Sequence, residues 1–195
     1  MDMTNGAERD GRTTGTWLKH PGRAAATAVA VAAVTGLALT GVAQAASPSA
    51  ASAPTCGVSD LDASLGKDLA GGMNHQGVVL HLENTSGKTC DLLGYPGLGL
   101  EDSDHTPLTS DTTWGTTWYA DDPGKAVLKL APGQSAEAVI AWTHANVDTS
   151  DGTHAAYLEV TPPASTGHKT VKFDNWVDNG QLTVTSLART VDLRG

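Results

Sequence analysis

The sequence predicts an all-β fold, an antiparallel Ig-like β-sandwich with one disulfide, on three observations. Short stretches of alternating apolar and polar residues recur at intervals of about 8–15 residues with turn-forming residues between them, as in sandwiches and barrels. No segment after residue 45 shows a 3.6-residue repeat of apolar positions. The chain also has two cysteines, Cys56 and Cys90, which can join two of the expected strands.

The first 45 residues have the pattern of an export signal. Four Lys or Arg residues precede an apolar run over 24–43, and Ala43-Gln44-Ala45 fits the small-x-small site of signal peptidase. The run is also long enough to span a bilayer, so a retained anchor is the alternative. Its content of mostly Ala, Val, Thr and Gly favours cleavage after Ala45. We therefore expect a signal peptide over 1–45 and a protein that is secreted, extracellular or associated with the cell envelope.

The residues between the export signal and Cys56 are rich in Ser, Ala and Pro. Such a segment lacks the large apolar side chains that form a core, so we expect a disordered leader over 46–55. The remaining residues are enough for one domain that buries about two-thirds of its unfolded surface. The sequence therefore predicts a single β-sandwich domain over 56–195, preceded by the signal peptide and the leader.

The stretch over 77–97 is the expected centre of this domain. Residues 78–83 alternate between apolar and more polar side chains, which is the pattern of a half-buried strand. Residues 84–88 (Asn-Thr-Ser-Gly-Lys) favour a chain reversal, and a second short strand is expected over 90–93. We expect these two strands to form a hairpin, followed by a corner where Tyr95 buries its ring and bonds its hydroxyl to backbone.

Further strands follow along the chain. The strand over 135–143 is the clearest, because Ala136, Ala138, Ile140 and Trp142 all fall on one face. Trp142 is therefore an expected core residue. The remaining expected strands cover 58–65, 98–101, 116–119, 126–130, 155–161, 170–176 and 182–186, with loops over 67–76 and 146–153 and a tight Ala-Pro-Gly-Gln turn over 131–134.

The simplest arrangement of two cysteines in an exported chain is one disulfide, Cys56–Cys90. It would close a loop of about 35 residues, which on the chain-entropy model stabilises the folded state by roughly 3–4 kcal/mol. A free reactive thiol is the alternative. A structural zinc site would need histidines at ligand spacing from these cysteines, and the sequence has none there.

The charge of the chain limits its partners. Residues 46–195 carry eight Lys or Arg against eighteen Asp or Glu, a formal charge of −10. Such a domain repels nucleic acid and anionic lipid. We therefore expect no nucleic-acid partner and no membrane contact after signal cleavage, and we read the charge mainly as a source of solubility.

The order of the motifs resembles that of a known family. The residues that carry the likeness are Cys56, Asp60-Leu61, Leu82-Glu83-Asn84-Thr85-Ser86-Gly87-Lys88-Thr89-Cys90, Leu93-Gly94-Tyr95-Pro96-Gly97, Leu130-Ala131-Pro132-Gly133-Gln134-Ser135-Ala136 and Val160-Thr161-Pro162-Pro163. Over about residues 56–186 they are similar to exported actinobacterial proteins catalogued as domain of unknown function number forty-two thirty-two. The resemblance implies a secreted or surface-held β-sandwich with the disulfide argued above. That family has no assigned activity, so the likeness implies no catalytic residues. Many members carry a second cysteine pair in the C-terminal half, which this chain lacks.

The sequence has no local motif for metal binding or nucleophilic catalysis. No two histidines after residue 45 lie at a His-x-His or His-x-x-x-His spacing, so a metal site would need two or three of them to meet in space. No Gly-x-Ser-x-Gly elbow occurs, and a Ser-His-Asp site would have to be assembled from distant loops. These histidines are His75, His81, His105, His144, His154 and His168. We therefore expect no cofactor, no metal and no catalytic residue.

Three groups of acidic residues lie in predicted loops, where calcium could bind as it does in many extracellular modules. None has the spacing of an EF-hand, so solvated turn residues are the simpler interpretation. The groups are Glu101, Asp102 and Asp104, then Asp121 and Asp122, then Asp148 and Asp151.

Trp114, Trp118 and Tyr119 are the best candidate binding residues. They lie in a polar, Thr-rich segment, where burial of all three is not expected from the neighbouring residues. Exposed aromatic rings beside hydrogen-bonding side chains form platforms for sugars or peptides. The alternative is a small aromatic cluster tucked under a long loop.

We therefore expect a non-enzymatic binding module of the cell envelope or extracellular space, with a cell-wall glycan or a secreted protein as its partner. A secreted hydrolase with a loop-assembled site is one alternative, and a deep pocket that holds a histidine near Ser or Asp would favour it. A calcium-dependent structural module is the other. The sequence leaves the oligomeric state open.

Overall fold

The computed structural model describes residues 52–70, 72–147 and 149–194. The expected signal peptide and most of the expected leader lie outside these residues. The chain divides into residues 1–47 and 48–195, and the fold described below belongs to the second unit. Among the described residues, no helix is long and apolar enough to cross a membrane.

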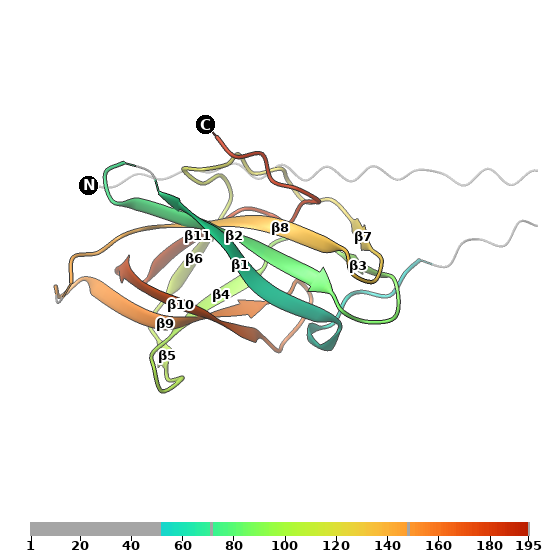
Figure 1. Cartoon of the computed structure of the whole chain (residues 1–195), viewed down its shortest axis with the longest axis horizontal. Coiled ribbons are helices and arrows are strands. Elements are labelled where there is room, and N and C mark those ends of the chain that lie inside the picture. Colours follow the sequence, from blue (N-terminus) through green and yellow to red (C-terminus); the bar gives the residue numbers. More distant parts are fainter. Residues whose placement is uncertain (1–51, 71, 148, 195) are drawn as a thin grey trace, which may run out of the picture. The chain divides into compact units, whose positions relative to one another are not determined.

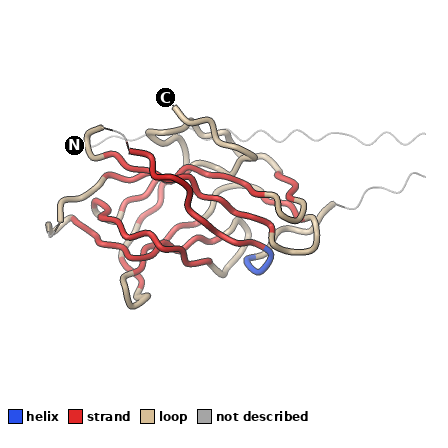
Figure 2. Tube along the Cα trace, in the orientation of Figure 1, coloured by secondary structure: helices blue, strands red, loops and turns tan. Residues whose placement is uncertain are grey.

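Strands are the main regular structure of the described residues; loops join them, and one 3₁₀ turn, η1, precedes the first strand (Figure 2). In chain order the elements are η1 (Val58–Asp60), β1 (Leu61–Ala70), β2 (His75–Asn84), β3 (Cys90–Leu92), β4 (Gly97–Glu101), β5 (Pro107–Leu108), β6 (Asp111–Trp114), β7 (Leu128–Leu130), β8 (Ser135–Thr143), β9 (Gly152–Thr161), β10 (Lys169–Asp178) and β11 (Gln181–Val184).

These strands build two layers, so the predicted all-β sandwich is confirmed. One sheet has the order β1-β2-β8-β11-β6 and the other has the order β10-β9-β4-β5. Figure 1 shows the first sheet lying across the second, with the small β3-β7 pair beside one end. Neighbouring strands are antiparallel except β6 and β11, which are parallel.

The core fills the space between the two layers. In β2 the inward residues Val78, Leu80 and Leu82 are at most 1% exposed, as their alternation predicts. Trp142 is also buried, and its ring meets that of Phe173 edge to face, with ring centroids 4.8 Å apart. The largest fully buried side chains are Leu61, Leu80, Leu82, Leu92, Leu100, Leu130, Ile140, Leu158, Leu182, Leu187, Val78 and Val139. Full burial of one such side chain stabilises the fold by about 1.5–3 kcal/mol.

The predicted hairpin over 77–97 is wrong, although both of its strands exist. β2 pairs with β1 on one side and with β8 on the other, so it has no free edge for β3. β3 pairs instead with β7, where Cys90 lies opposite Leu130. The polar residues over 84–88 therefore make a connection between two sheets, which a local turn pattern cannot distinguish from a hairpin.

Several strand boundaries also differ from the sequence prediction, and two of these differences are large. The loop expected over 67–76 is shorter, because β1 continues through a bulge after Leu65. Its pairing with β2 extends to Ala70, which lies opposite Gln76. An edge strand was expected over 116–119. The edge strand of the sheet is β6, which lies just before these residues in the sequence and pairs with β11. Both errors concern strands at or near a sheet edge, where exposed faces weaken the apolar alternation.

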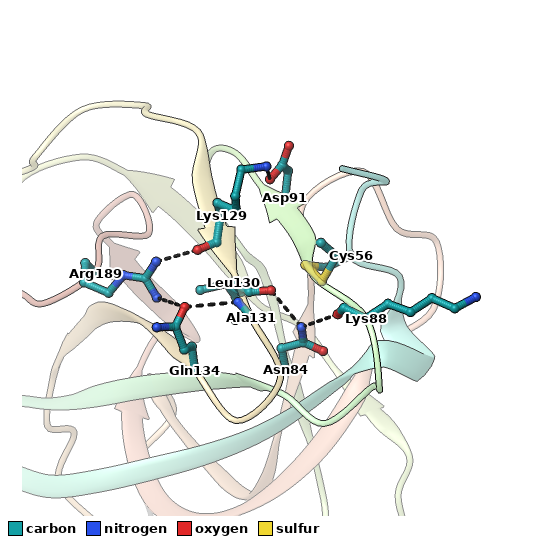
Figure 3. Close-up of polar contacts among 10 residues, drawn as sticks. Cys56, Asn84, Lys88, Asp91, Lys129, Leu130, Ala131, Gln134 and Arg189 are labelled. Carbon is teal, nitrogen blue, oxygen red and sulfur yellow. Dashed lines mark hydrogen bonds and ion pairs between the residues drawn. A yellow bond between two sulfur atoms is a disulfide. The ribbon is translucent and has the colours of Figure 1, made fainter. Parts of the chain in front are cut away.

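Asn84 fixes the connection between β2 and β3 (Figure 3). Its side chain is fully buried, and its Nδ2 donates to the carbonyl oxygens of Lys88 and Leu130, both at 2.8 Å. Its Oδ1 accepts from the backbone N–H and the hydroxyl of Ser86 at 3.0 and 2.8 Å. On the main chain, Gly133 donates to the Asn84 carbonyl at 2.7 Å, so the Pro-Gly turn closes on the same residue. Asn84 thus holds the turn over 84–88 and the Pro-Gly turn through its buried side-chain amide and its main-chain carbonyl.

The Pro-Gly turn itself follows the prediction. Gly133 has a φ of 76°, the left-handed conformation that glycine adopts without a steric penalty. Gln134 N–H donates to the Ala131 carbonyl at 3.0 Å, and its side-chain Oε1 accepts from Ala131 N–H and from the Arg189 guanidinium (Figure 3).

The predicted disulfide Cys56–Cys90 is confirmed, with the two Cα atoms 5.0 Å apart. It ties the N-terminal segment to β3, and the backbone around it pairs as well. Cys56 N–H donates to the Asp91 carbonyl at 3.0 Å, and Asp91 N–H donates to the Pro54 carbonyl at 2.8 Å. Both cysteines are buried, so the bridge is part of the core.

Candidate binding cleft

A polar cleft of about 370 Å³ lies on the outer face of the five-stranded sheet. Ile140 and Trp142 face the core, so Ala141 and Thr143 on the same strand point to the opposite face, where the cleft is. We name it the Trp118 cleft. Its lining residues are Thr116, Thr117, Trp118, Ala141, Trp142, Thr143, Asp178, Gln181, Thr183 and Arg194.

The loop after β6 forms one wall of the cleft. Thr117 is buried, and its hydroxyl oxygen accepts from the backbone N–H groups of Tyr119 and Ala120 at 3.2 and 3.1 Å. Tyr119 lies across the sheet above Gly77, where an added Cβ would come within 2.6 Å of its ring. The Tyr119 hydroxyl donates to the His75 carbonyl at 2.6 Å. Tyr119 therefore anchors the wall to the sheet.

Arg194 joins this wall to the C-terminal segment. One guanidinium nitrogen donates to the Thr117 carbonyl at 2.8 Å, and the other pairs with Asp121. The Arg194 backbone N–H also donates to the Tyr119 carbonyl at 2.7 Å. Sequence reasoning missed Arg194, because its place in the cleft depends on contacts with residues more than 70 positions earlier.

Trp118 presents the aromatic surface of the cleft. It is 65% exposed, and its ring stacks on the imidazole of His75 with centroids 3.8 Å apart. Stacking supports the indole from one side while most of it stays in contact with solvent. An exposed indole beside Thr hydroxyls, a Gln amide, a carboxylate and a guanidinium is the combination found in sites for polar ligands with apolar faces.

Trp114 is similarly exposed, at 58%, but it lies outside the residues that line the cleft. Its ring stacks almost parallel on Tyr95, with centroids 5.4 Å apart. The three predicted aromatic residues are thus placed differently: Trp118 lines the cleft, Tyr119 supports its wall, and Trp114 belongs to a second aromatic pair.

Tyr95 is half-buried, and its hydroxyl donates to Asp122 Oδ2 at 2.6 Å, so its expected bond to backbone is replaced by one to a carboxylate. Burial alone would raise the pKa of Asp122, but the hydrogen bonds from Tyr95 and from the Ser186 N–H together hold the pKa below its usual range. The same hydrogen bond raises the pKa of the Tyr95 hydroxyl. Asp122 therefore stays ionised and fixes the end of the wall loop.

A second group of polar residues lies on the other sheet, outside the cleft. Glu101 is 4% exposed, and its Oε2 lies 2.7 Å from His105 Nδ1. Burial raises the pKa of Glu159, and its hydrogen bond with Glu101 raises it further. Burial acts the same way on Glu101, but its hydrogen bonds with His105 and Glu159 lower the pKa overall. Glu159 is thus the carboxyl of this pair that holds a proton more readily.

The alternatives raised by the sequence can be compared with these sites. None of the residues that line the Trp118 cleft is a histidine or a serine. Among the acidic loops, Asp121 pairs with Arg194, while Asp102 Oδ1 accepts from the backbone of Asp104 and Thr106 at 2.8 and 2.9 Å. These carboxylates already have partners within the protein, and Asp148 lies outside the described residues.

Comparison with known families assigns the family but no activity. A family model described as Domain of unknown function (DUF4232) matches residues 56–188. No curated protein and no solved structure matches the chain. The match ends before Arg194, and it includes the other residues that line the Trp118 cleft.

Proposed function

We propose that this chain, which belongs to the DUF4232 family of domains of unknown function, is a non-enzymatic binding module of the extracellular space or cell envelope. The ligand occupies the Trp118 cleft. The observation that carries the proposal is the exposed Trp118 ring, which His75 holds from one side at the rim of a polar cleft.

The chemistry of the cleft favours a carbohydrate. Sugar rings have an apolar face that stacks on an indole and hydroxyls that bond to the side chains of Gln181, Thr183 and Asp178. The negative charge of residues 46–195 disfavours polyanionic polymers, so the proposed ligand is a neutral glycan of the cell wall. The disulfide supports an oxidising location, as expected for an exported protein.

A sedimentation assay with purified, insoluble cell-wall polysaccharide tests this proposal. The full chain should sediment with the polymer, and Trp118→Ala should weaken binding at least tenfold, because a large aromatic contact contributes about 1.4 kcal/mol or more to binding. Trp114→Ala is the matched control, since it removes a similarly exposed indole outside the cleft. It should bind like the parent chain.

The substitution at Trp118 should leave the fold intact, because most of its side chain is in solvent. Its free energy of unfolding should change by less than about 0.5 kcal/mol. Equal sedimentation of the parent and Trp118→Ala would contradict the proposed site. Absence of binding to the polysaccharide, with capture of a secreted protein that depends on Trp118, would replace the glycan with a protein partner.

A further inference from the structure

A cluster of two glutamates and two histidines lies on the four-stranded sheet, on the face turned away from the core. Leu100 and Leu158 are buried, so the next residues along their strands, Glu101 and Glu159, point to the opposite face. In the β4–β9 register Glu101 lies opposite Tyr157 and Glu159 lies opposite Gly99. The two carboxylates are therefore diagonal neighbours on one face of adjacent strands.

His168 completes the cluster from the residue just before β10. Its Nε2 lies 3.5 Å from Glu159 Oε1 and 4.0 Å from Glu101 Oε1. One ligand atom from each of the three residues falls within 4.8 Å of the others. Tetrahedral zinc with bonds of about 2.0–2.1 Å separates its ligand atoms by roughly 3.3 Å. Small side-chain movements would bring the three atoms to that spacing.

Gly99 leaves the room that this arrangement requires. A Cβ added at Gly99 would lie 2.5 Å from Glu159 Oε2, closer than nonbonded atoms approach. The absence of a side chain there lets the Glu159 carboxylate lie across β4 toward Glu101. The backbone of Gly99 is not in the left-handed conformation that favours glycine. The space that the Glu159 carboxylate occupies is therefore the physical reason for a glycine at this position.

His105 orients the buried carboxylate. Its Nδ1 binds Glu101 Oε2 at 2.7 Å, and its ring stacks on Tyr157 with centroids 4.2 Å apart. One oxygen of Glu101 is thereby held, and the other, Oε1, faces His168. A histidine that holds a ligating carboxylate from behind is a common outer-shell arrangement in metal sites.

The cluster combines two carboxylates with two histidines. Within the part of the chain that the structure describes, the ion pairs of Glu101 and Glu159 are with histidines and involve no Lys or Arg. Glu101 is almost fully buried, where an ionised carboxylate needs a compensating cation or strong hydrogen bonds. Glu101 has such hydrogen bonds, with His105 and with Glu159, and a divalent ion would add a compensating cation beside both carboxylates.

We propose that Glu101, Glu159 and His168 form a binding site for a divalent transition metal of the zinc type, with His105 as the residue that positions Glu101. The imidazole ligand and the small number of donors favour zinc over calcium, which takes six to eight oxygen ligands. The site joins β4, β9 and the start of β10 across the surface of one sheet. It is separate from the Trp118 cleft and does not depend on a ligand there.

Zinc titration of the full chain against a chromophoric chelator tests the site. The parent chain should take up one equivalent of Zn²⁺ that His168→Ala and Glu159→Gln bind at least tenfold more weakly. His105→Ala should weaken binding about tenfold, the loss typical of an outer-shell partner. His154→Ala is the matched control, because His154 also lies near one carboxylate, Asp174, at 3.2 Å, but outside the cluster. It should bind zinc like the parent.

Gly99→Ala provides a second measurement that does not remove a ligand. The atom in conflict is the far end of a flexible side chain, so the fold should tolerate the methyl group while the Glu159 carboxylate moves away. Zinc should then bind more weakly, and Zn²⁺ should raise the melting temperature of the parent but much less that of Gly99→Ala. Unchanged zinc affinity in His168→Ala would overturn the proposal, and so would Ca²⁺ binding as strong as that of Zn²⁺.

Discussion

The two ends of β2 differ in how they are held. At one end Asn84 is buried and the neighbouring disulfide Cys56–Cys90 is covalent, so the polar groups there are satisfied inside the protein. We call this the closed end. At the other end His75 supports the exposed Trp118, and the wall of the cleft is held by Asp121 with Arg194 and by the half-buried Asp122.

The difference shows what the family likeness does and does not describe. The motifs that carry the resemblance include the Asn-Thr-Ser-Gly run before Cys90 and the Leu-Ala-Pro-Gly-Gln turn, and the structure places both at the closed end around Asn84. None of the motif residues lines the Trp118 cleft. This part of the signature therefore reports how the sheets are joined, whereas its Tyr95 contacts Asp122 in the wall loop.

Removing the disulfide should produce the largest effect at the closed end. Cys56→Ala combined with Cys90→Ala releases a chain segment of 34 residues, which should lower the free energy of unfolding by about 3–4 kcal/mol. Urea unfolding of the double variant measures it, and the reduced parent chain is the control because it should lose a similar amount. An unchanged midpoint in both would show that the bridge does not stabilise the closed end.

Asn84→Ala should have the next largest effect. The change leaves the carbonyls of Lys88 and Leu130 without their buried donor, so we expect a loss of about 2–3 kcal/mol in the free energy of unfolding. Asn175→Ala is the control, since the half-buried Asn175 side chain bonds only locally to the Phe173 carbonyl in the described contacts. Its loss should stay below about 1 kcal/mol. Equal losses in the two variants would remove the distinction made for Asn84.

The end of β2 near the Trp118 cleft should show a smaller effect that depends on pH. The folded pKa of Asp122 is lowered, so its contribution is present above the unfolded pKa of about 3.9 and is lost as the pH falls through the folded value. Asp122→Asn should therefore cost about 1 kcal/mol near neutral pH, and the difference from the parent should vanish once Asp122 is protonated. Urea unfolding at a series of pH values measures this difference.

Asp104→Asn serves as the control for that series, because Asp104 is an exposed residue in a different turn. Its unfolding free energy should follow that of the parent chain at every pH. A constant difference between Asp122→Asn and the parent down to the lowest pH would show that the ionised carboxylate is not what holds the wall loop.

The parts of the fold that the sequence predicted are those with strong local patterns. The β8 strand over 135–143 alternates clearly, and the turn at Gly133 needs a residue that tolerates positive φ, so both were predicted with correct boundaries or conformation. The pairing of β3 was predicted wrongly. The polar residues over 84–88 form the same local pattern whether the next strand pairs with β2 or with β7. Strand order depends on contacts between distant residues, which periodicity does not contain.

The candidate sites divide in the same way. The exposure of Trp118 was foreseeable from its polar neighbours, but the rest of the cleft comes from β8, β11 and Arg194. The metal cluster depends on the register of β4 and β9, which brings Glu101 near Glu159. No spacing within one stretch of sequence could have grouped these residues, since each site is made only when the sheets form.

The backbone pairing between Pro54 and Asp91 also decides how the domain is presented when it is immobilised. The chain enters at the closed end, and β2 alone extends about 30 Å from there to His75 at the cleft. A bead, surface or fusion partner attached upstream of Pro54 would leave Trp118 directed outward for capture experiments. An affinity tag joined after Arg194 would instead begin at the rim and could obstruct whatever enters it.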